Sequence, residues 1–289
     1  MTQGMLFFAL LALAHSATAS ASRPTLDSAA NSPSNSPAHC GESPADSQWQ
    51  GSPWLAPTSQ IDCDHPSIQR LAQQLGGKAT GARQKAVAIH RFVRDEIAFG
   101  WAPEFYQQRA SETLATGRGY CNTKGPLFVA LLRASGIPAR LRFIELRSEV
   151  LGGLVDTGGP YVDHAYTEVW LEGSWVSVDS YVVDRSLAEA ARQRLESTGT
   201  LLGYGIHRNG VSEWDGLGDS FVQFVDDGSV PGLSNREYGL FSDVESFYRQ
   251  EPSAHNRKTW ISSLALRVFL PSANRRIAKL RETSESSSP

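Results

Sequence analysis

Two stretches of the chain carry hydrophobic residues at helical spacing. In residues 67–75, and again in residues 80–97, the apolar positions recur every three or four residues, with polar or charged positions between them. This pattern predicts two amphipathic helices. Ser67 or Asp64 is the expected N-cap of the first helix, and a pair of glycines is its expected end.

A continuous apolar run follows Cys121. Residues 127–132 are all hydrophobic, and Gly136 and Pro138 follow the run, as is common where a helix ends. The run therefore predicts a buried helix with Cys121 near its N-terminus. Pro126 removes one backbone donor early in this helix, so an irregular first turn is expected.

Residues further along the chain alternate between apolar and polar types. Residues 139–146 are rich in strand formers, which predicts a β-strand. Residues 165–171 and 174–179 have the same character and flank the dipeptide Glu172-Gly173. These two segments predict a β-hairpin with a two-residue turn.

The hairpin turn sets a register that places two polar residues together. With a two-residue loop, Asp179 faces Tyr166 and His164 faces Tyr181 across the hairpin. His164 and Asp179 then become diagonal neighbours on one face of the sheet, with Cα atoms about 7–8 Å apart. An imidazole and a carboxylate at that separation are within reach of each other.

The two ends of the chain differ in composition from the middle. An apolar run at residues 5–14 is followed by small residues, which predicts a signal peptide over residues 1–19 and an exported protein, periplasmic or secreted. The run is shorter than the roughly 20 residues that span a bilayer. No Lys or Arg precedes it, so an apolar start packed on the domain is the alternative. Residues 20–59, rich in Ser and Pro, and residues 282–289 predict a disordered leader and tail.

Charge and cysteine content narrow the possible partners. The net charge of −3, with both signs interspersed, disfavours nucleic acid as a partner. The cysteines are Cys40, Cys63 and Cys121, and none has the spacing of a structural zinc site. In an oxidising compartment Cys40 and Cys63 can pair and leave Cys121 reduced. Two unpaired residues in the leader and the linker are the alternative.

Cys121, His164 and Asp179 together have the chemistry of a thiol enzyme. A helix N-terminus and a neighbouring imidazolium stabilise a thiolate, and a carboxylate fixes the tautomer and orientation of the imidazole. Cys121 is the predicted nucleophile, His164 its base and Asp179 the orienting group. Each residue taken alone is more often structural, but the combination in this register favours catalysis. No metal or organic cofactor is required.

Two motifs around these residues resemble the core of the transglutaminase-like superfamily. The first is Gly-Tyr-Cys-Asn-Thr-Lys at residues 119–124, followed by Ala-Leu-Leu-Arg-Ala-Ser-Gly-Ile-Pro-Ala-Arg at residues 130–140. The second is His-Ala-Tyr-Thr-Glu-Val-Trp at residues 164–170, followed by Trp-Val-Ser-Val-Asp at residues 175–179. The resemblance is most specific over residues 117–181.

The resemblance implies an α+β fold related to papain, in which the helix that carries the cysteine packs on an antiparallel sheet that carries the histidine and the aspartate. It also implies a bacterial-type, exported member with Cys121, His164 and Asp179 as the catalytic triad. Two features depart from the family pattern. Residues 125–126 (Gly-Pro) interrupt the helix, and the family's oxyanion partner has only Trp101 as a candidate.

The expected reaction is thiol-dependent acyl transfer or hydrolysis at amide bonds of peptide or protein substrates, through a thioester on Cys121. The alternatives are a secreted cysteine peptidase or amidase that uses only water, and a non-catalytic peptide-binding module of the same fold. Residues 60–185 are the predicted core, and residues 186–281 are a predicted C-terminal extension packed on it. Stable membrane insertion after removal of the signal peptide is not expected.

Overall fold

The computed structural model describes residues 49–77, 79–255 and 260–285. The predicted signal peptide, most of the predicted leader with Cys40, and the last residues of the predicted tail lie outside these ranges. Within the ranges, none of the helices combines the length and the hydrophobicity that crossing a membrane requires.

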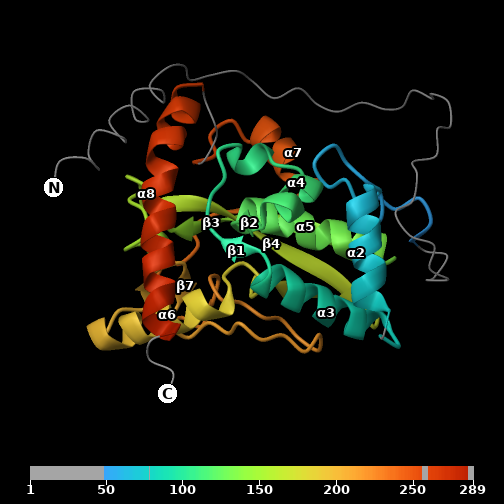
Figure 1. The fold of residues 1–289 in the computed structure, drawn as a ribbon, viewed down its shortest axis with the longest axis horizontal. Coiled ribbons are helices and arrows are strands. Elements are labelled where there is room, and N and C mark those ends of the chain that lie inside the picture. The colour runs from blue at the N-terminus through green and yellow to red at the C-terminus, as the bar shows by residue number, and fades with distance from the viewer. Residues whose placement is uncertain (1–48, 78, 256–259, 286–289) are drawn as a thin grey trace.

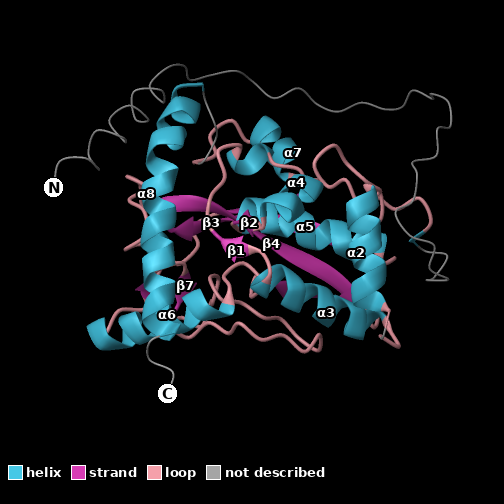
Figure 2. Cartoon of the chain, in the orientation of Figure 1, coloured by secondary structure: helices cyan, strands magenta, loops and turns pink. Residues whose placement is uncertain are grey.

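A four-stranded antiparallel sheet forms the middle of the molecule (Figure 2). Its strands, in spatial order, are β5 (Ser174–Val178), β4 (Tyr161–Leu171), β3 (Ala139–Arg147) and β8 (Glu237–Phe241). The predicted hairpin is β4–β5, and its register is the predicted one, since Leu171 pairs with Ser174. Glu172 and Gly173 have φ angles of 51° and 92°, as a type I′ turn requires.

The rest of the fold consists mainly of helices that pack around this sheet. They are α2 (Pro66–Gly76), α3 (Ala82–Asp95), α4 (Ala110–Thr116), α5 (Cys121–Ala134), α6 (Arg185–Thr198), α7 (Val244–Gln250) and α8 (Trp260–Glu285), with the 3-10 turns η2 (Phe105–Gln107) and η3 (Ser148–Leu151). The short strands β1 (Ala98–Phe99) and β2 (Arg118–Gly119) pair in parallel, and β6 (Leu202–Gly203) and β7 (Ile206–His207) pair antiparallel. In Figure 1, α5 lies in the centre with β4 passing behind it, and α8 stands at the opposite side of the molecule from α2.

The predicted α+β architecture is confirmed, because the helix that begins at Cys121 packs on an antiparallel sheet. Two local predictions were wrong. The helix is continuous from Cys121 through Pro126, where an irregular first turn was expected. Pro126 lies in the second turn, and one missing donor there leaves the flanking helical bonds in place. The cap of α2 is His65, which accepts a hydrogen bond from the backbone of Ser67, and is neither Ser67 nor Asp64.

Residues at both edges of the described chain belong to the fold although their composition predicts disorder. Residues 49–59 pack on the domain, and the ring of Trp49 lies 5.3 Å from that of Trp170 and 5.7 Å from that of Trp175. Residues 282–285, which the composition assigns to the tail, continue α8. The packing of Trp49 and the continuation of α8 therefore give these segments a defined structure, although their composition is polar.

The C-terminal extension contributes to the sheet itself. β8 lies beside β3, although sequence reasoning predicted no strand there. The segment has only five residues, and Gly239 within it has a φ of 97°, so it shows little strand patterning. α8 runs unbroken past Pro271, although a proline inside a helix removes one backbone donor. The side chain of Pro271 is exposed, so its ring causes no clash with the core.

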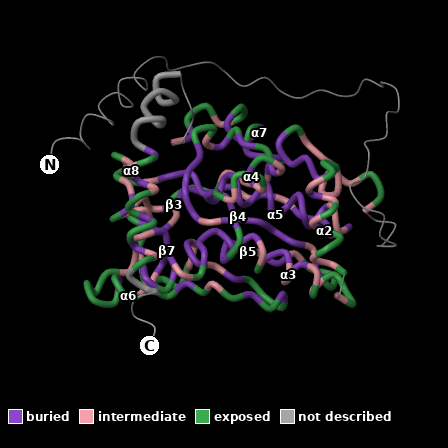
Figure 3. Tube along the Cα trace, in the orientation of Figure 1, coloured by how far each residue is buried: buried purple, intermediate pink, exposed green. Residues whose placement is uncertain are grey.

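The helix α5 is buried along almost its whole length (Figure 3). Even Lys124 is fully buried, and its Nζ donates to the carbonyl oxygens of Ile97 at 2.7 Å and of Arg94 at 3.2 Å. Burial lowers the pKa of Lys124 to about 7. These two bonds join the start of α5 to the end of α3, and they fix the position of Cys121 relative to the surrounding helices.

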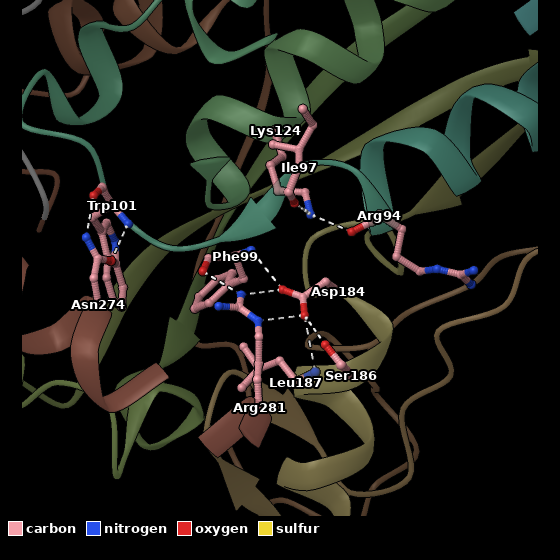
Figure 4. A network of polar contacts seen from close by, with 10 residues as sticks. All are labelled: Arg94, Ile97, Phe99, Trp101, Lys124, Asp184, Ser186, Leu187, Asn274 and Arg281. Carbon is pink, nitrogen blue, oxygen red and sulfur yellow. Dashed lines mark hydrogen bonds and ion pairs between the residues drawn. The ribbon is translucent and has the colours of Figure 1, made fainter. Parts of the chain in front are cut away.

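Polar contacts hold the second half of α8 against the core (Figure 4). Arg281 donates from Nε to Oδ1 of Asp184 at 2.9 Å and from Nη2 to the carbonyl oxygen of Phe99 at 2.9 Å. Asn274 pairs with the backbone of Trp101 in both directions, at 3.0 Å and 2.8 Å. The extension is therefore attached to the β1 region that precedes α5.

We expect Arg281→Met to lower the free energy of unfolding at pH 7 by about 2–3 kcal/mol, because it removes one partner of a partly buried ion pair. Burial alone would raise the pKa of Asp184, but the hydrogen bond and charge of Arg281 lower it to about 2. A carboxyl pKa below its unfolded value of about 3.9 contributes stability that is present above that pH and is lost as the pH falls toward 2.

Urea unfolding at pH 7 and at pH 3 measures both effects. The exposed neighbour variant Arg275→Met is the control, and it should behave like the wild type at both pH values. A loss of stability in Arg281→Met that is equally large at pH 3 would contradict the role of this ion pair.

Candidate active site

Cys121 is the first residue of α5, and its thiol is free. Two glycines shape the chain before it. Gly117 ends α4 with a φ of 61°, and a Cβ at Gly119 would lie 2.6 Å from Oγ1 of Thr123. The left-handed φ at residue 117 favours glycine, and the close approach at residue 119 leaves no room for a Cβ. The chain therefore passes sharply from α4 into α5, and the thiol lies at the positive end of the helix dipole.

His164 lies between the thiol of Cys121 and the carboxylate of Asp179. Its Nε2 is 3.0 Å from Oδ2 of Asp179, and the side chain of Cys121 is among the groups that raise its pKa. Since Asp179 engages Nε2, Nδ1 is the nitrogen left for the thiol. His164 and Asp179 are 1% and 0% exposed, whereas Cys121 is 9% exposed. Cys121 is therefore the most exposed of these three residues.

Asp179 lies just beyond the end of β5 and is held by backbone N–H groups. Its Oδ1 accepts from the N–H groups of Val222 and Gln223, and its Oδ2 accepts from that of Phe224 at 2.9 Å. We call the N–H groups of residues 222–224 the Asp179 cradle. With these donors and His164 around it, the carboxylate has one fixed orientation.

The structure thus brings together all three predicted site residues, and the hairpin register accounts for the contact between His164 and Asp179. Sequence reasoning missed the Asp179 cradle, because backbone N–H groups carry no side-chain signal. It also missed Tyr248 of α7, whose hydroxyl oxygen accepts from Nδ2 of Asn122 at 3.0 Å.

Aromatic rings pack together at the start of α5. The ring of Tyr120 stacks on that of Phe105 at 5.0 Å and lies 6.2 Å from that of Trp101. Trp101, the oxyanion candidate, therefore packs beside the residue that precedes Cys121. The hydroxyl group of Tyr120 is buried and has no hydrogen-bond partner in the described part of the chain. Burial raises the pKa of Tyr120 well above its ordinary value.

The electrostatics of the site favour a protonated imidazole. Burial alone would lower the pKa of His164, but the hydrogen bonds to Asp179 and Cys121 and the charges of these two groups raise it to about 9. At neutral pH the imidazolium is therefore the stable form. It can hold a thiolate beside it and can also give a proton to a leaving group.

We expect the imidazole of His164 to titrate with a midpoint near pH 9 and to remain protonated below that pH. Proton NMR of the histidine ring hydrogens measures this, and His164→Gln identifies the resonance. His207 is an internal comparison, because burial lowers its pKa from the ordinary 6.5. A midpoint for His164 at or below 6.5 would contradict the expected pairing with Cys121 and Asp179.

The cysteines fall into two classes. Cys63 is buried and disulfide-bonded, whereas Cys121 is free. Cys40, one possible partner of Cys63, lies outside the described residues. The free thiol is thus the one at the start of α5.

Part of this chain matches the model of one known protein family. Residues 69–180 match the model of the transglutaminase-like superfamily. That range includes Cys121, His164 and Asp179 and ends before the Asp179 cradle. No curated protein matches the chain.

Two solved structures show local similarity. One is a proposed cysteine protease from Cytophaga hutchinsonii, 26% identical, with 43% of this chain and 39% of that chain covered and a TM-score of 0.36. The other is a proposed protease from Parabacteroides distasonis, 16% identical, with 38% and 22% covered and a TM-score of 0.30. The matched parts are thus less than half of each of these chains. Residues 69–180 of this chain are thus similar to the transglutaminase-like superfamily.

Proposed function

We propose that this protein is a thiol enzyme that cleaves amide bonds of peptide or protein substrates through a thioester on Cys121. The observation that carries the proposal is the buried row of thiol, imidazole and carboxylate at the start of a helix. A thiol, an imidazole and a carboxylate in hydrogen-bond contact are what nucleophilic catalysis at a carbonyl requires. The family match over the same residues supports this reading.

In the first step the thiolate of Cys121 attacks the carbonyl carbon, and a C–S bond forms while the carbonyl oxygen becomes an oxyanion. The first N–H groups of a helix have no intrahelical partner and can donate to that oxyanion. When the intermediate collapses, the C–N bond breaks, and the imidazolium of His164 gives its proton to the departing amine. A thioester on Cys121 remains.

In the second step water or an amine attacks the thioester, and neutral His164 takes a proton from it. The C–S bond then breaks, the thiolate returns and the imidazolium is restored. Asp179 stays ionised throughout and holds the ring in one orientation. Water makes the reaction a hydrolysis, and an amine makes it an acyl transfer. Both remain within the proposal, with water as the simpler acceptor.

The test uses dimethylated casein as the acyl donor, with and without dansylcadaverine as the amine, and mass spectrometry of the products. New peptide termini or converted glutamine side chains without the amine indicate hydrolysis. Dansyl incorporation indicates acyl transfer. Protein first alkylated with iodoacetamide is the control. If neither product forms, and if Cys121 reacts with iodoacetamide no faster than in His164→Ala, the protein is a non-catalytic binding module.

We also propose that the protein is exported from the cytosol. Disulfides form and persist in oxidising compartments and are rare in the cytosol. The disulfide at Cys63 and the apolar N-terminal run both support export, periplasmic or secreted. Fractionation of expressing cells tests this, and a protein that stays in the cytosol with a reduced Cys63 would contradict it.

A further inference from the structure

The family match ends at residue 180, yet the orienting carboxylate of the site is held from beyond it. The Asp179 cradle lies in the extension, more than 40 residues further along the chain. Its N–H groups are useful only if residues 222–224 are themselves held in place. The contacts that hold residues 222–224 in place therefore affect the orientation of the Asp179 carboxylate.

One side chain fastens this segment from within. Gln223 is 2% exposed, and its Nε2 donates to the carbonyl oxygen of Gly205 at 2.6 Å. Its own backbone N–H donates to Oδ1 of Asp179 at 3.2 Å. Gln223 thus connects the carboxylate of Asp179 with the backbone of Gly205.

Gly205 is itself hydrogen-bonded to the region that follows β3. The N–H group of Gly205 donates to the carbonyl oxygen of Val150 in η3 at 2.7 Å, and Gly205 has a φ of 90° that favours glycine. Beside it, the N–H group of His207 donates to the carbonyl oxygen of Val222 at 2.8 Å. The cradle is therefore tied to β7 and to the region that follows β3.

We infer that Gln223 is a positioning residue of this site, which holds the Asp179 cradle in register and through it orients the carboxylate that pairs with His164. Its effect on catalysis rests on the proposed function, but its effect on the orientation of Asp179 and His164 does not. The charged or titratable groups that act on His164 are Asp179 and Cys121. A shift of the Asp179 cradle therefore changes the interaction between the Asp179 carboxylate and the imidazole of His164.

The test replaces Gln223 by methionine, which has nearly the same length and no N–H donor. We expect the NMR titration midpoint of His164 to fall by at least about one pH unit, because a misplaced carboxylate stabilises the imidazolium less. Alkylation of Cys121 by iodoacetamide at pH 8.5 should slow by about threefold, because a midpoint lowered from about 9 to about 8 reduces the protonated fraction of His164 from about three quarters to about one quarter.

Gln60 provides a matched control. It is also a buried glutamine whose side chain bonds to backbone groups, and its Oε1 accepts from the N–H groups of Val244 and Glu245 at the start of α7. Gln60→Met should lose stability as Gln223→Met does, while the titration midpoint of His164 stays at its wild-type value. Equal midpoints in wild type and Gln223→Met would overturn the inference, and so would equal shifts in both variants.

If Gln223→Met does not fold, Gly210→Ala tests the same segment by a different route. A Cβ at residue 210 would lie 2.5 Å from the carbonyl oxygen of Val222, so the cradle must move. The expected result is again a lower midpoint for His164, and an unchanged midpoint in the folded variant would overturn the inference.

Kinetics separate this inference from the proposed function. With an active substrate from the casein test, kcat of Gln223→Met should fall by about 10- to 100-fold, with KM within about twofold, because the substrate contacts are unchanged. If the wild type cleaves no amide but the midpoint of His164 still moves in Gln223→Met, the proposed function fails and the positioning role stands. If the wild type is active and the midpoint does not move, the opposite holds.

Discussion

Replacing Cys121 by alanine is expected to lower the rate of amide cleavage by at least about 10⁴-fold, because it removes the atom that forms the thioester. The fold should survive the change. Cys121 is a small, nearly buried residue, and its loss leaves α5 and its packing in place. The free energy of unfolding should therefore change by no more than about 1–2 kcal/mol.

The measurement is the rate of casein cleavage for wild type and Cys121→Ala at equal concentrations of folded protein. Electrospray mass spectrometry after rapid acid quenching should show an acyl adduct on the wild type and none on the variant. A variant that kept more than about a tenth of the wild-type rate would show that the thiol is not the nucleophile. Cys121→Ser is a second comparison, since a hydroxyl group beside the same imidazole is far less ionised than a thiol.

Asp179→Asn is expected to lower kcat by about 10³–10⁴-fold, although the side chain keeps its size. The reason is the hydrogen-bond polarity. In the wild type, Oδ2 of Asp179 accepts from Nε2 of His164 and from the N–H group of Phe224. An amide NH₂ group at that position is a donor facing two donors. His164 must then turn its lone pair toward residue 179 and present the wrong tautomer to the thiol.

The same substitution should also cost stability. The amide oxygen can still accept from Val222 and Gln223, but the N–H group of Phe224 loses its partner, which costs about 1–3 kcal/mol. Urea unfolding measures this loss, and NMR follows His164, whose midpoint should fall well below the wild-type value of about 9. A variant that keeps both its kcat within tenfold and its His164 midpoint would contradict the orienting role of Asp179.

The hairpin is the part of the site that sequence reasoning predicted best. The turn Glu172-Gly173 admits only a narrow set of backbone angles, and such a turn sets the pairing of both strands. The contact between His164 and Asp179 follows from that pairing alone. The helix that begins at Cys121 was also predictable, since its apolar run and its glycine and proline stop signals are local.

The contacts made by the extension were not predictable in this way. Residues 222–224 hold Asp179 through backbone N–H groups, which every residue except proline has and which therefore leave no trace in the sequence. β8 was missed because five residues that include a glycine show little alternation. Arg281 and Asp184, which join α8 to the core, lie nearly one hundred residues apart, and no local pattern links them.

The sequence alone determined the elements and the chemistry that local interactions control: the helix that starts at Cys121, the hairpin, its register and hence the imidazole–carboxylate pair. The tertiary structure alone decided how that pair is held, how far it is buried and what surrounds the thiol. The physical reason is the sequence distance over which each kind of interaction acts. Turn geometry and helix signals act over a few residues, whereas the Asp179 cradle, its anchor at Gln223 and the attachment of α8 form only when distant segments pack together.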